Sequence, residues 1–185
     1  GVAFRDITLL DCLSGDQQVV DPLFGSVLVI EDPSGARVAI LSLDQLVPDM
    51  PRLRERMASE LGIEHTFSNS SHTHSVARPS RTPEWHARTE QLLWDAAVEA
   101  TSNMTPVTLS AGRAPVEIGY NRNREQFSQA TVPWVNVLVV NRIDDSQEPL
   151  AVLFEYAAHP VVTQNAECIS ADYPAYAAKR IRAEL

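Results

Sequence analysis

The feature that most constrains the fold is an apolar hairpin in the first quarter of the chain. Residues 23–30 and 37–43 are each rich in Val, Ile and Leu, and the sequence Asp-Pro-Ser-Gly at 32–35 separates them. Proline and glycine suit the backbone angles of a tight turn, so this pattern predicts two paired strands. The second run is nearly all apolar, which favours a central strand covered on both faces.

A helical pattern follows this hairpin. Residues 51–61 carry Leu53, Met57 and Leu61 at helical intervals, and Gly62 then fits a C-terminal cap. The hydrophobic residues thus change from a strand pattern to a helical pattern within about 30 residues, which favours a fold that contains both strands and helices.

The rest of the chain continues this alternation. Thr82 suits the N-cap of a long helix, and Pro83 suits its first turn. The patterns predict a loop at 11–21, strands at 2–8, 63–70, 107–111, 116–120, 134–143 and 150–156, and helices at 82–101 and after Pro174. We therefore predict an α/β fold with a mixed β-sheet layered with helices. The last helix has no Gly or Asn cap beyond it, so we expect residues 1–185 to be one N-terminal domain of a longer catalytic protein.

Charge and hydropathy exclude two classes of function. Lys and Arg total 15 against 24 Asp and Glu, a formal net charge of −9, which would repel a phosphate backbone. No apolar run approaches the roughly 18 residues of a membrane-spanning helix. We expect neither nucleic-acid binding nor a transmembrane segment. Cys12 and Cys168 could form one disulfide or remain two buried thiols, so the compartment stays open.

Three histidines are the main candidates for chemistry. His72 and His74 lie two residues apart at the expected end of a strand, where side chains two apart share one face. The pair could hold a metal, or could be two surface histidines in a serine-rich loop. His159 follows an apolar strand and precedes Pro160, a place where α/β folds put site residues, although its position alone favours a core histidine.

Arginine and acidic residues at other element ends are weaker candidates. Arg122 follows an expected strand, and its guanidinium could hold a carbonyl, carboxylate or phosphate. Asp44 and Asp172 are carboxylates at a strand edge and a helix edge, each a candidate metal ligand, partner of a ligand, or turn or cap residue. His65 and His86 fit ordinary positions in a strand and a helix.

Taken in order, these segments resemble the N-terminal part of the neutral, non-lysosomal ceramidases. The resemblance begins with the opening Gly-Val-Ala-Phe-Arg-Asp-Ile-Thr and covers nearly the whole chain. Six further segments follow in the order of that family: 21–23 (Asp-Pro-Leu), 41–44 (Leu-Ser-Leu-Asp), 70–75 (Ser-Ser-His-Thr-His-Ser), 119–123 (Gly-Tyr-Asn-Arg-Asn), 156–160 (Tyr-Ala-Ala-His-Pro) and 170–174 (Ser-Ala-Asp-Tyr-Pro).

The resemblance implies a zinc-dependent hydrolase that cleaves an N-acyl amide bond of a sphingolipid or a related small molecule. It assigns His72 and His159 to the metal, and His74 and Arg122 to the active site. The family's remaining ligands, a glutamate and a tyrosine, and its reactive serine lie further along its chain, so the resemblance implies half of a zinc site here. A secreted or periplasmic location would fit the family.

The loops around the site depart from the family. The residues after His74, Arg122 and His159 differ from the family's usual sequences, and these loops should shape the substrate entrance. Two alternatives therefore stand beside the ceramidase: a related metal hydrolase acting on another polar amide or ester, and a non-catalytic binding module that keeps the fold. Without the family's other ligands, we expect weak zinc binding, or binding completed by Asp44, water or a neighbouring chain.

Overall fold

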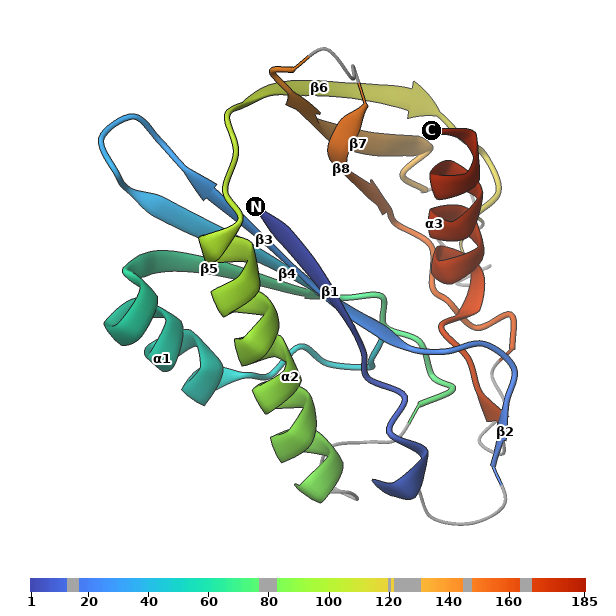
Figure 1. Cartoon of the computed structure of the whole chain (residues 1–185). Helices are drawn as coiled ribbons and strands as arrows, with labels where there is room; N and C mark the ends of the chain where they lie inside the picture. The colour runs from blue at the N-terminus through green and yellow to red at the C-terminus, as the bar shows by residue number, and fades with distance from the viewer. Residues whose placement is uncertain (13–16, 77–82, 120, 122–130, 145–147, 164–167) are drawn as a thin grey trace. The chain divides into compact units, whose positions relative to one another are not determined.

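The computed structural model describes residues 1–12, 17–76, 83–119, 121, 131–144, 148–163 and 168–185 (Figure 1). The chain divides into two compact units. The first contains Gly1–Met104 and Pro160–Glu184, and the second contains Thr105–His159. The prediction of one domain over residues 1–185, extended by further chain, stays a prediction.

The first unit is built on a mixed four-stranded sheet. Its strands are β1 (Val2–Asp6), β3 (Phe24–Glu31), β4 (Arg37–Leu43) and β5 (Ile63–Ser70), in the order β1-β3-β4-β5. The first three pair antiparallel, whereas β4 and β5 are parallel. A parallel pair needs a crossover, which α1 (Pro51–Leu61) supplies. The predicted α/β class with a mixed sheet is confirmed.

The predicted hairpin is β3 and β4, and its turn has the expected chemistry. Gly35 has φ +86° and donates its N–H to the carbonyl of Asp32 at 3.0 Å. In the left-handed region glycine avoids the steric cost of a Cβ. The Asp32 carboxylate accepts hydrogen bonds from the N–H groups of Ser34 and Ala36, which closes the turn. Local sequence therefore determines the register of this pair.

Strand β4 is central, as predicted, but only one of its faces is fully buried. Ala39, Leu41 and Leu43 are almost completely excluded from solvent, whereas Ile40 on the opposite face is half-buried and Ser42 is exposed. The expectation that both faces of this strand are covered is therefore wrong for the face that carries Ile40 and Ser42. The sheet is mixed, and its antiparallel strands, unlike those of an all-parallel sheet, commonly leave one face open to water.

Two helices cover the buried face of the sheet. Helix α1 ends at Gly62, which has φ +64° and donates its N–H to the carbonyl of Met57, so the predicted C-cap is confirmed. Helix α2 (Pro83–Ser102) packs against β1, β3 and α1, and the predicted N-cap Thr82 lies outside the described residues. The Glu90 carboxylate on α2 accepts the N–H of Leu53 at 2.9 Å and so supplies the cap that the start of α1 lacks.

The expected loop at 11–21 contains structure that the sequence did not indicate. A short 3-10 helix, η1, covers Leu10–Cys12, and β2 (Gln18–Val19) pairs parallel with β9 (Cys168–Ile169). Strands of two residues have no periodicity to detect, and these two are about 150 positions apart. The side chain of Cys168 is buried. Helix α3 (Asp172–Glu184) follows β9, as predicted.

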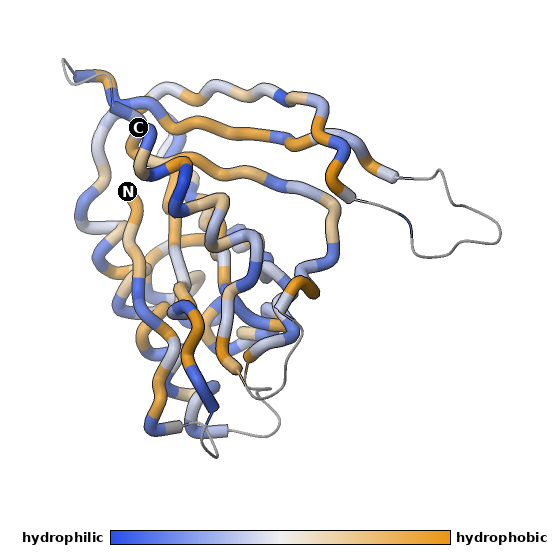
Figure 2. The backbone as a smooth tube through the Cα atoms, turned by 90° about the vertical axis from the view of Figure 1, so that its right-hand side faces the viewer, coloured by the Kyte–Doolittle hydropathy of each residue, from blue (hydrophilic) through white to orange (hydrophobic). Residues whose placement is uncertain are grey.

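The second unit is an antiparallel sheet of three strands. They are β6 (Val107–Pro115), β7 (Trp134–Arg142) and β8 (Pro149–Tyr156), in the order β6-β7-β8. The hydrophobic run of the middle strand can be followed in orange in Figure 2. This confirms the predicted second hairpin. Among the described residues of the whole chain, no helix is long and apolar enough to cross a membrane.

The predicted strand at 116–120 is wrong for residues 116–119, which are irregular, and residue 120 lies outside the described part of the chain. The backbone here is held by the side chain of Tyr156 and by one bond from the N–H of Val116 to the carbonyl of Pro133 at 2.9 Å. The Tyr156 hydroxyl accepts the N–H of Gly119 at 2.9 Å and donates to the carbonyl of Val116 at 3.1 Å. A phenol that satisfies the backbone in this way removes the need for a strand partner.

Candidate metal centre

The loop that carries His72 and His74 begins directly after β5. Ser71 donates its N–H to the carbonyl of Leu43, and His72 donates its N–H to the carbonyl of Gln45 at 3.0 Å. His72 has φ +63°, in the left-handed region that is costly for a residue with a Cβ. Backbone held in such a conformation is concentrated at functional sites, because the surrounding structure must impose it.

Thr73 separates the two histidines and points into the protein. It is completely buried, and its Oγ1 donates to the carbonyl of Ser170 at 2.7 Å. The rings of His72 and His74 lie beside one another, with centroids 5.1 Å apart and planes at 88°. The predicted pairing of the two rings is confirmed. Its stated reason is not, because His72 is left-handed rather than extended.

One ring nitrogen of His72 has a defined role. Its Nδ1 lies 2.7 Å from the carbonyl oxygen of Leu46, and a carbonyl can only accept, so Nδ1 carries the proton. Nε2 is then the nitrogen with a lone pair. Histidines that bind metals usually donate their other N–H to a carbonyl or carboxylate in this way, which sets the tautomer and the direction of the ring.

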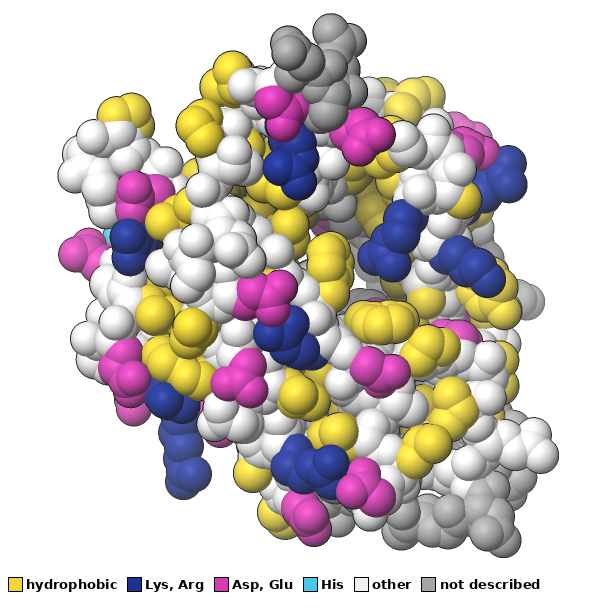
Figure 3. All heavy atoms as spheres, in the orientation of Figure 1, with side chains coloured by type: hydrophobic (Ala, Val, Ile, Leu, Met, Phe, Trp, Pro, Cys, Tyr) yellow, Lys and Arg dark blue, Asp and Glu magenta, His cyan; other side chains and the backbone are white. Residues whose placement is uncertain are grey.

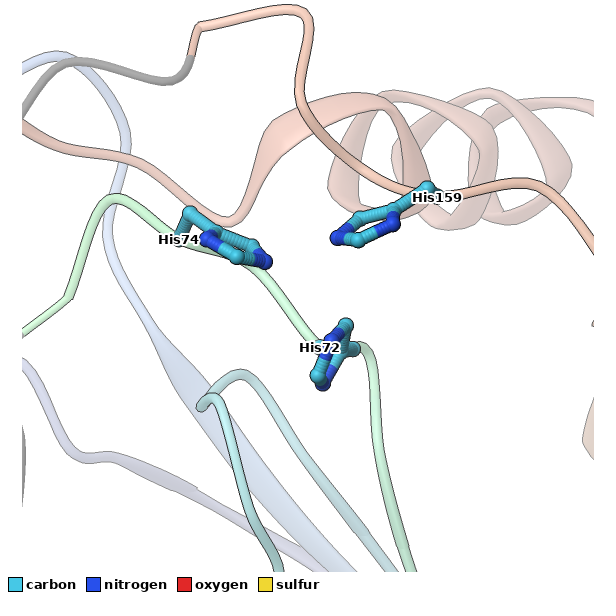
Figure 4. Close-up of side chains that lie close together, drawn as sticks. All are labelled: His72, His74 and His159. Carbon is cyan, nitrogen blue, oxygen red and sulfur yellow. The ribbon is translucent and has the colours of Figure 1, made fainter. Parts of the chain in front are cut away.

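His159 completes a group of three imidazoles. It directly precedes Pro160, at which the chain returns to the first unit. The nearest candidate ligand atoms of His72, His74 and His159 all lie within 4.8 Å of one another. Figure 4 shows the three rings turned toward a common space, two from the loop after β5 and one from the segment after β8. His159 is exposed, which excludes its interpretation as a core histidine.

This arrangement could hold a metal ion. Imidazole nitrogen is a good ligand for zinc, copper, nickel and iron, so three rings at this spacing define a site without selecting among these metals. His72 and His159 are exposed and His74 is half-buried, which keeps the site accessible to water and substrate. The candidate ligands found among the described residues are these three histidines, and Asp44 is not among them.

Asp44 instead ties the ends of two strands together. Its Oδ2 accepts the N–H of Phe24 at 3.0 Å, and its own N–H donates to the carbonyl of Phe24. Burial raises the pKa of this carboxyl to about 6, against the opposing hydrogen bond from the Phe24 N–H, and the nearby charge of Asp21 also raises it. The structure thus supports the interpretation of Asp44 as a structural residue at the strand end.

The remaining predicted residues are placed as follows. Arg122 lies outside the described residues, whereas its neighbour Asn121 is described. Asp172 is the first residue of α3, and its Oδ1 accepts the N–H of the next residue, Tyr173, at 2.7 Å, so its predicted role as an N-cap stays a prediction. His65 and His86 take no part in the three-histidine group, as predicted.

Two supports of the site were not predicted from the sequence. The carbonyl of Leu46 orients His72, and a backbone oxygen leaves no trace in the residue type. The contact between Thr73 and Ser170 spans 97 positions. In the sequence, only the small polar residues around Thr73 and Ser170 indicated that these segments could form hydrogen bonds. On the face drawn in Figure 3, acidic and basic side chains are interspersed.

Solved ceramidase structures have the fold of this chain. The neutral ceramidase from Pseudomonas aeruginosa matches with a TM-score of 0.74, covering 96% of this chain and 34% of its own, at 15% sequence identity. A ceramidase complexed with C2 matches with a TM-score of 0.69, covering 96% of this chain and 34% of its own, at 16% identity. No protein-family model and no curated protein sequence matches the chain.

These comparisons establish the fold. The chain spans about a third of the length of the two ceramidases. At 15–16% identity, the likeness confirms that the chain has the mixed α/β fold of part of a ceramidase, as the sequence motifs predicted. Activity and substrate are separate questions, because a fold alone does not determine function.

Proposed function

We propose that this chain carries part of the zinc site of a hydrolase of the neutral ceramidase type, which cleaves an N-acyl amide bond. One observation supports this most strongly: three imidazoles within 4.8 Å of one another, on a fold shared with ceramidases. His72 and His159 are 87 positions apart in the sequence, so it is the fold that brings their side chains close together.

His72 and His159 are the proposed zinc ligands. The hydrogen bond from His72 Nδ1 to the Leu46 carbonyl supports this role, because it presents Nε2 as the ligand atom. Zinc bound there would supply Lewis acidity, which polarises an amide carbonyl and makes water a stronger nucleophile near neutral pH. Two imidazoles are fewer than the four ligands of a closed zinc site, so substrate and further ligands have room to bind.

His74 and Arg122 are the proposed catalytic residues. The His74 ring lies edge-on to His72 and is close enough to take or return a proton beside the metal. Arg122 would hold the oxygen on which negative charge develops, a role that suits its fixed fork of donors. The assignment of Arg122 rests on the resemblance of its Asn-Arg motif alone.

A zinc titration tests the metal assignment. The protein is freed of metal with a chelator, and zinc affinity is measured by calorimetry for the wild type, His72→Ala and His159→Ala. Each variant should bind at least ten times more weakly, since each loses one ligand. His65→Ala is the matched control, because His65 is exposed and lies outside the three-histidine group. Equal affinity in all four proteins would refute the proposed site.

A substrate comparison tests the reaction. The zinc-loaded full-length gene product is assayed with an N-acyl sphingosine and with short-chain amides and esters of similar polarity, and the released carboxylic acid is quantified. Preferential cleavage of the N-acyl sphingosine supports the ceramidase type. Cleavage of the short substrates alone would replace it with another metal hydrolase, and zinc binding without any cleavage would favour a binding module.

A further inference from the structure

A buried hydrogen-bond cluster centred on Ser170 lies in the first unit. Ser170 is completely buried and uses every polar group it has. Its N–H donates to the carbonyl of Ser75 at 2.9 Å, and its hydroxyl donates to the Asp21 carboxylate at 2.6 Å. The same hydroxyl accepts the N–H of Asp172 at 3.0 Å, and its carbonyl accepts the Thr73 hydroxyl at 2.7 Å.

One side of this cluster holds the loop that carries two of the histidines. Thr73 lies between His72 and His74, and Ser75 follows them, so both contacts to Ser170 enclose His74. The Thr73 hydroxyl also accepts the N–H of Ser75 at 3.3 Å. A loop fixed at two points, one residue either side of His74, holds the backbone from which that ring projects.

The other side of the cluster holds the segment that follows His159. Pro160 is buried, and the N–H of Thr163 donates to the Asp172 carboxylate at 2.8 Å. Asp172 is itself buried with φ +58°, a left-handed conformation that the bond from its N–H to Ser170 helps to hold. The chain from Pro160 to Thr163 is therefore tied to the same serine as the histidine loop.

We propose that Thr73 and Ser170 are positioning residues for the metal centre, because their hydrogen bond fixes the loop of His72 and His74 against the segment that begins at Pro160. This inference rests on the proposed metal site. Neither residue touches the metal. Groups that orient ligands from a distance typically change metal affinity by about 10–100-fold when removed, because the ligands then have to be ordered on binding.

The test compares zinc affinity in Thr73→Val, Thr73→Ser and wild type. Valine matches threonine in shape but has no hydroxyl, so zinc affinity should fall by about 10–100-fold. Serine keeps the hydroxyl and should restore most of it. Cobalt substituted for zinc should also show a changed visible spectrum in Thr73→Val, since its ligands would be less ordered. If Thr73→Val does not fold, Thr73→Ala is the second variant, because it also lacks the hydroxyl, whereas a change at Ser170 would leave in place the backbone carbonyl that accepts it.

Thr8→Val is the matched control. Thr8 is also buried in the first unit, where its hydroxyl donates to Asp6 and accepts the N–H of Leu23 at 3.0 Å. This variant should lose stability without losing zinc affinity. Unchanged affinity in Thr73→Val, or an equal loss in Thr8→Val, would overturn the positioning role. A wild type that binds no zinc would instead refute the proposed function itself.

Discussion

The substitution Asp44→Asn should make the first unit more stable at neutral pH. Burial raises the pKa of Asp44 from 3.8 to about 6, so the folded protein disfavours the ionised carboxylate. Asparagine carries no charge, yet its side-chain oxygen can still accept the N–H of Phe24. The variant thus removes the cost of a buried charge and keeps the hydrogen bond between the strand ends.

The size of the effect follows from the two pKa values. Between pH 3.8 and pH 6 the folded protein binds more protons at Asp44 than the unfolded chain does, so its stability falls as the pH rises through this window. The free energy of unfolding falls by roughly 3 kcal/mol in total, and the loss is complete above pH 6. The variant should therefore equal the wild type near pH 3.8 and exceed it by up to about 3 kcal/mol at pH 7.5.

Urea unfolding at a series of pH values measures this difference. Trp85 and Trp94 belong to the first unit, so a Trp134→Phe background restricts the fluorescence signal to that unit. A chelator is included so that metal binding does not contribute. The free energy of unfolding is then compared, from pH 4 to pH 7.5, between this background with Asp44 intact and the same background carrying Asp44→Asn.

Asp32→Asn is the control of opposite sign. Hydrogen bonds from the Ser34 hydroxyl and the Ala36 N–H hold the pKa of Asp32 below its usual value, so its stabilising effect is present above pH 3.8 and lost as the pH falls. This variant should be less stable than the wild type at neutral pH. A difference between Asp44→Asn and wild type that stays constant with pH would refute the assignment of a raised pKa to Asp44.

Three further outcomes are expected. Gly62→Ala should cost about 1 kcal/mol in urea unfolding, because its φ of +64° is unfavourable for alanine even where the space around it is open; an unchanged stability would contradict the C-cap. Leu93→Ala should cost about 3 kcal/mol, since Leu93 is completely buried and packs closely over Gly25; a cost below about 1 kcal/mol would show a loosely packed core. His74→Gln should keep most of the zinc affinity and lose turnover, whereas lost zinc would make His74 a third ligand.

Elements with strong local patterns could be predicted from the sequence. The hairpin of β3 and β4 has a Pro-Gly turn, and α1 ends on a glycine, so each carried its own signal. The pairing of β2 with β9 had none, because it joins two-residue strands from opposite ends of the chain. The prediction of a strand at residues 116–119 was wrong for a related reason. The sequence pattern predicts a strand, but only the fold reveals that the Tyr156 hydroxyl bonds the backbone of this segment.

The candidate site divides in the same way. The identity of His72, His74 and His159 could be read from their motifs, because metal chemistry selects residue types. The contacts that hold these side chains in place could not be predicted. They are the hydrogen bond to the Leu46 carbonyl, the left-handed backbone at His72 and the hydrogen bond of the buried Thr73 hydroxyl. These are properties of tertiary structure. The spacing of His72 and His74 correctly predicted that their rings lie side by side, but it assumed an extended backbone that His72 does not have.

Nitrogen-15 NMR of the imidazole rings during a zinc titration tests the central claim most directly, because it observes each of the five histidines separately. We expect the ring resonances of His72 and His159 to change at stoichiometric zinc, with Nε2 of His72 as the bound nitrogen, while those of His65 and His86 stay in place. Weak, parallel shifts of all five rings, or a bound nitrogen at His72 Nδ1, would contradict this expectation.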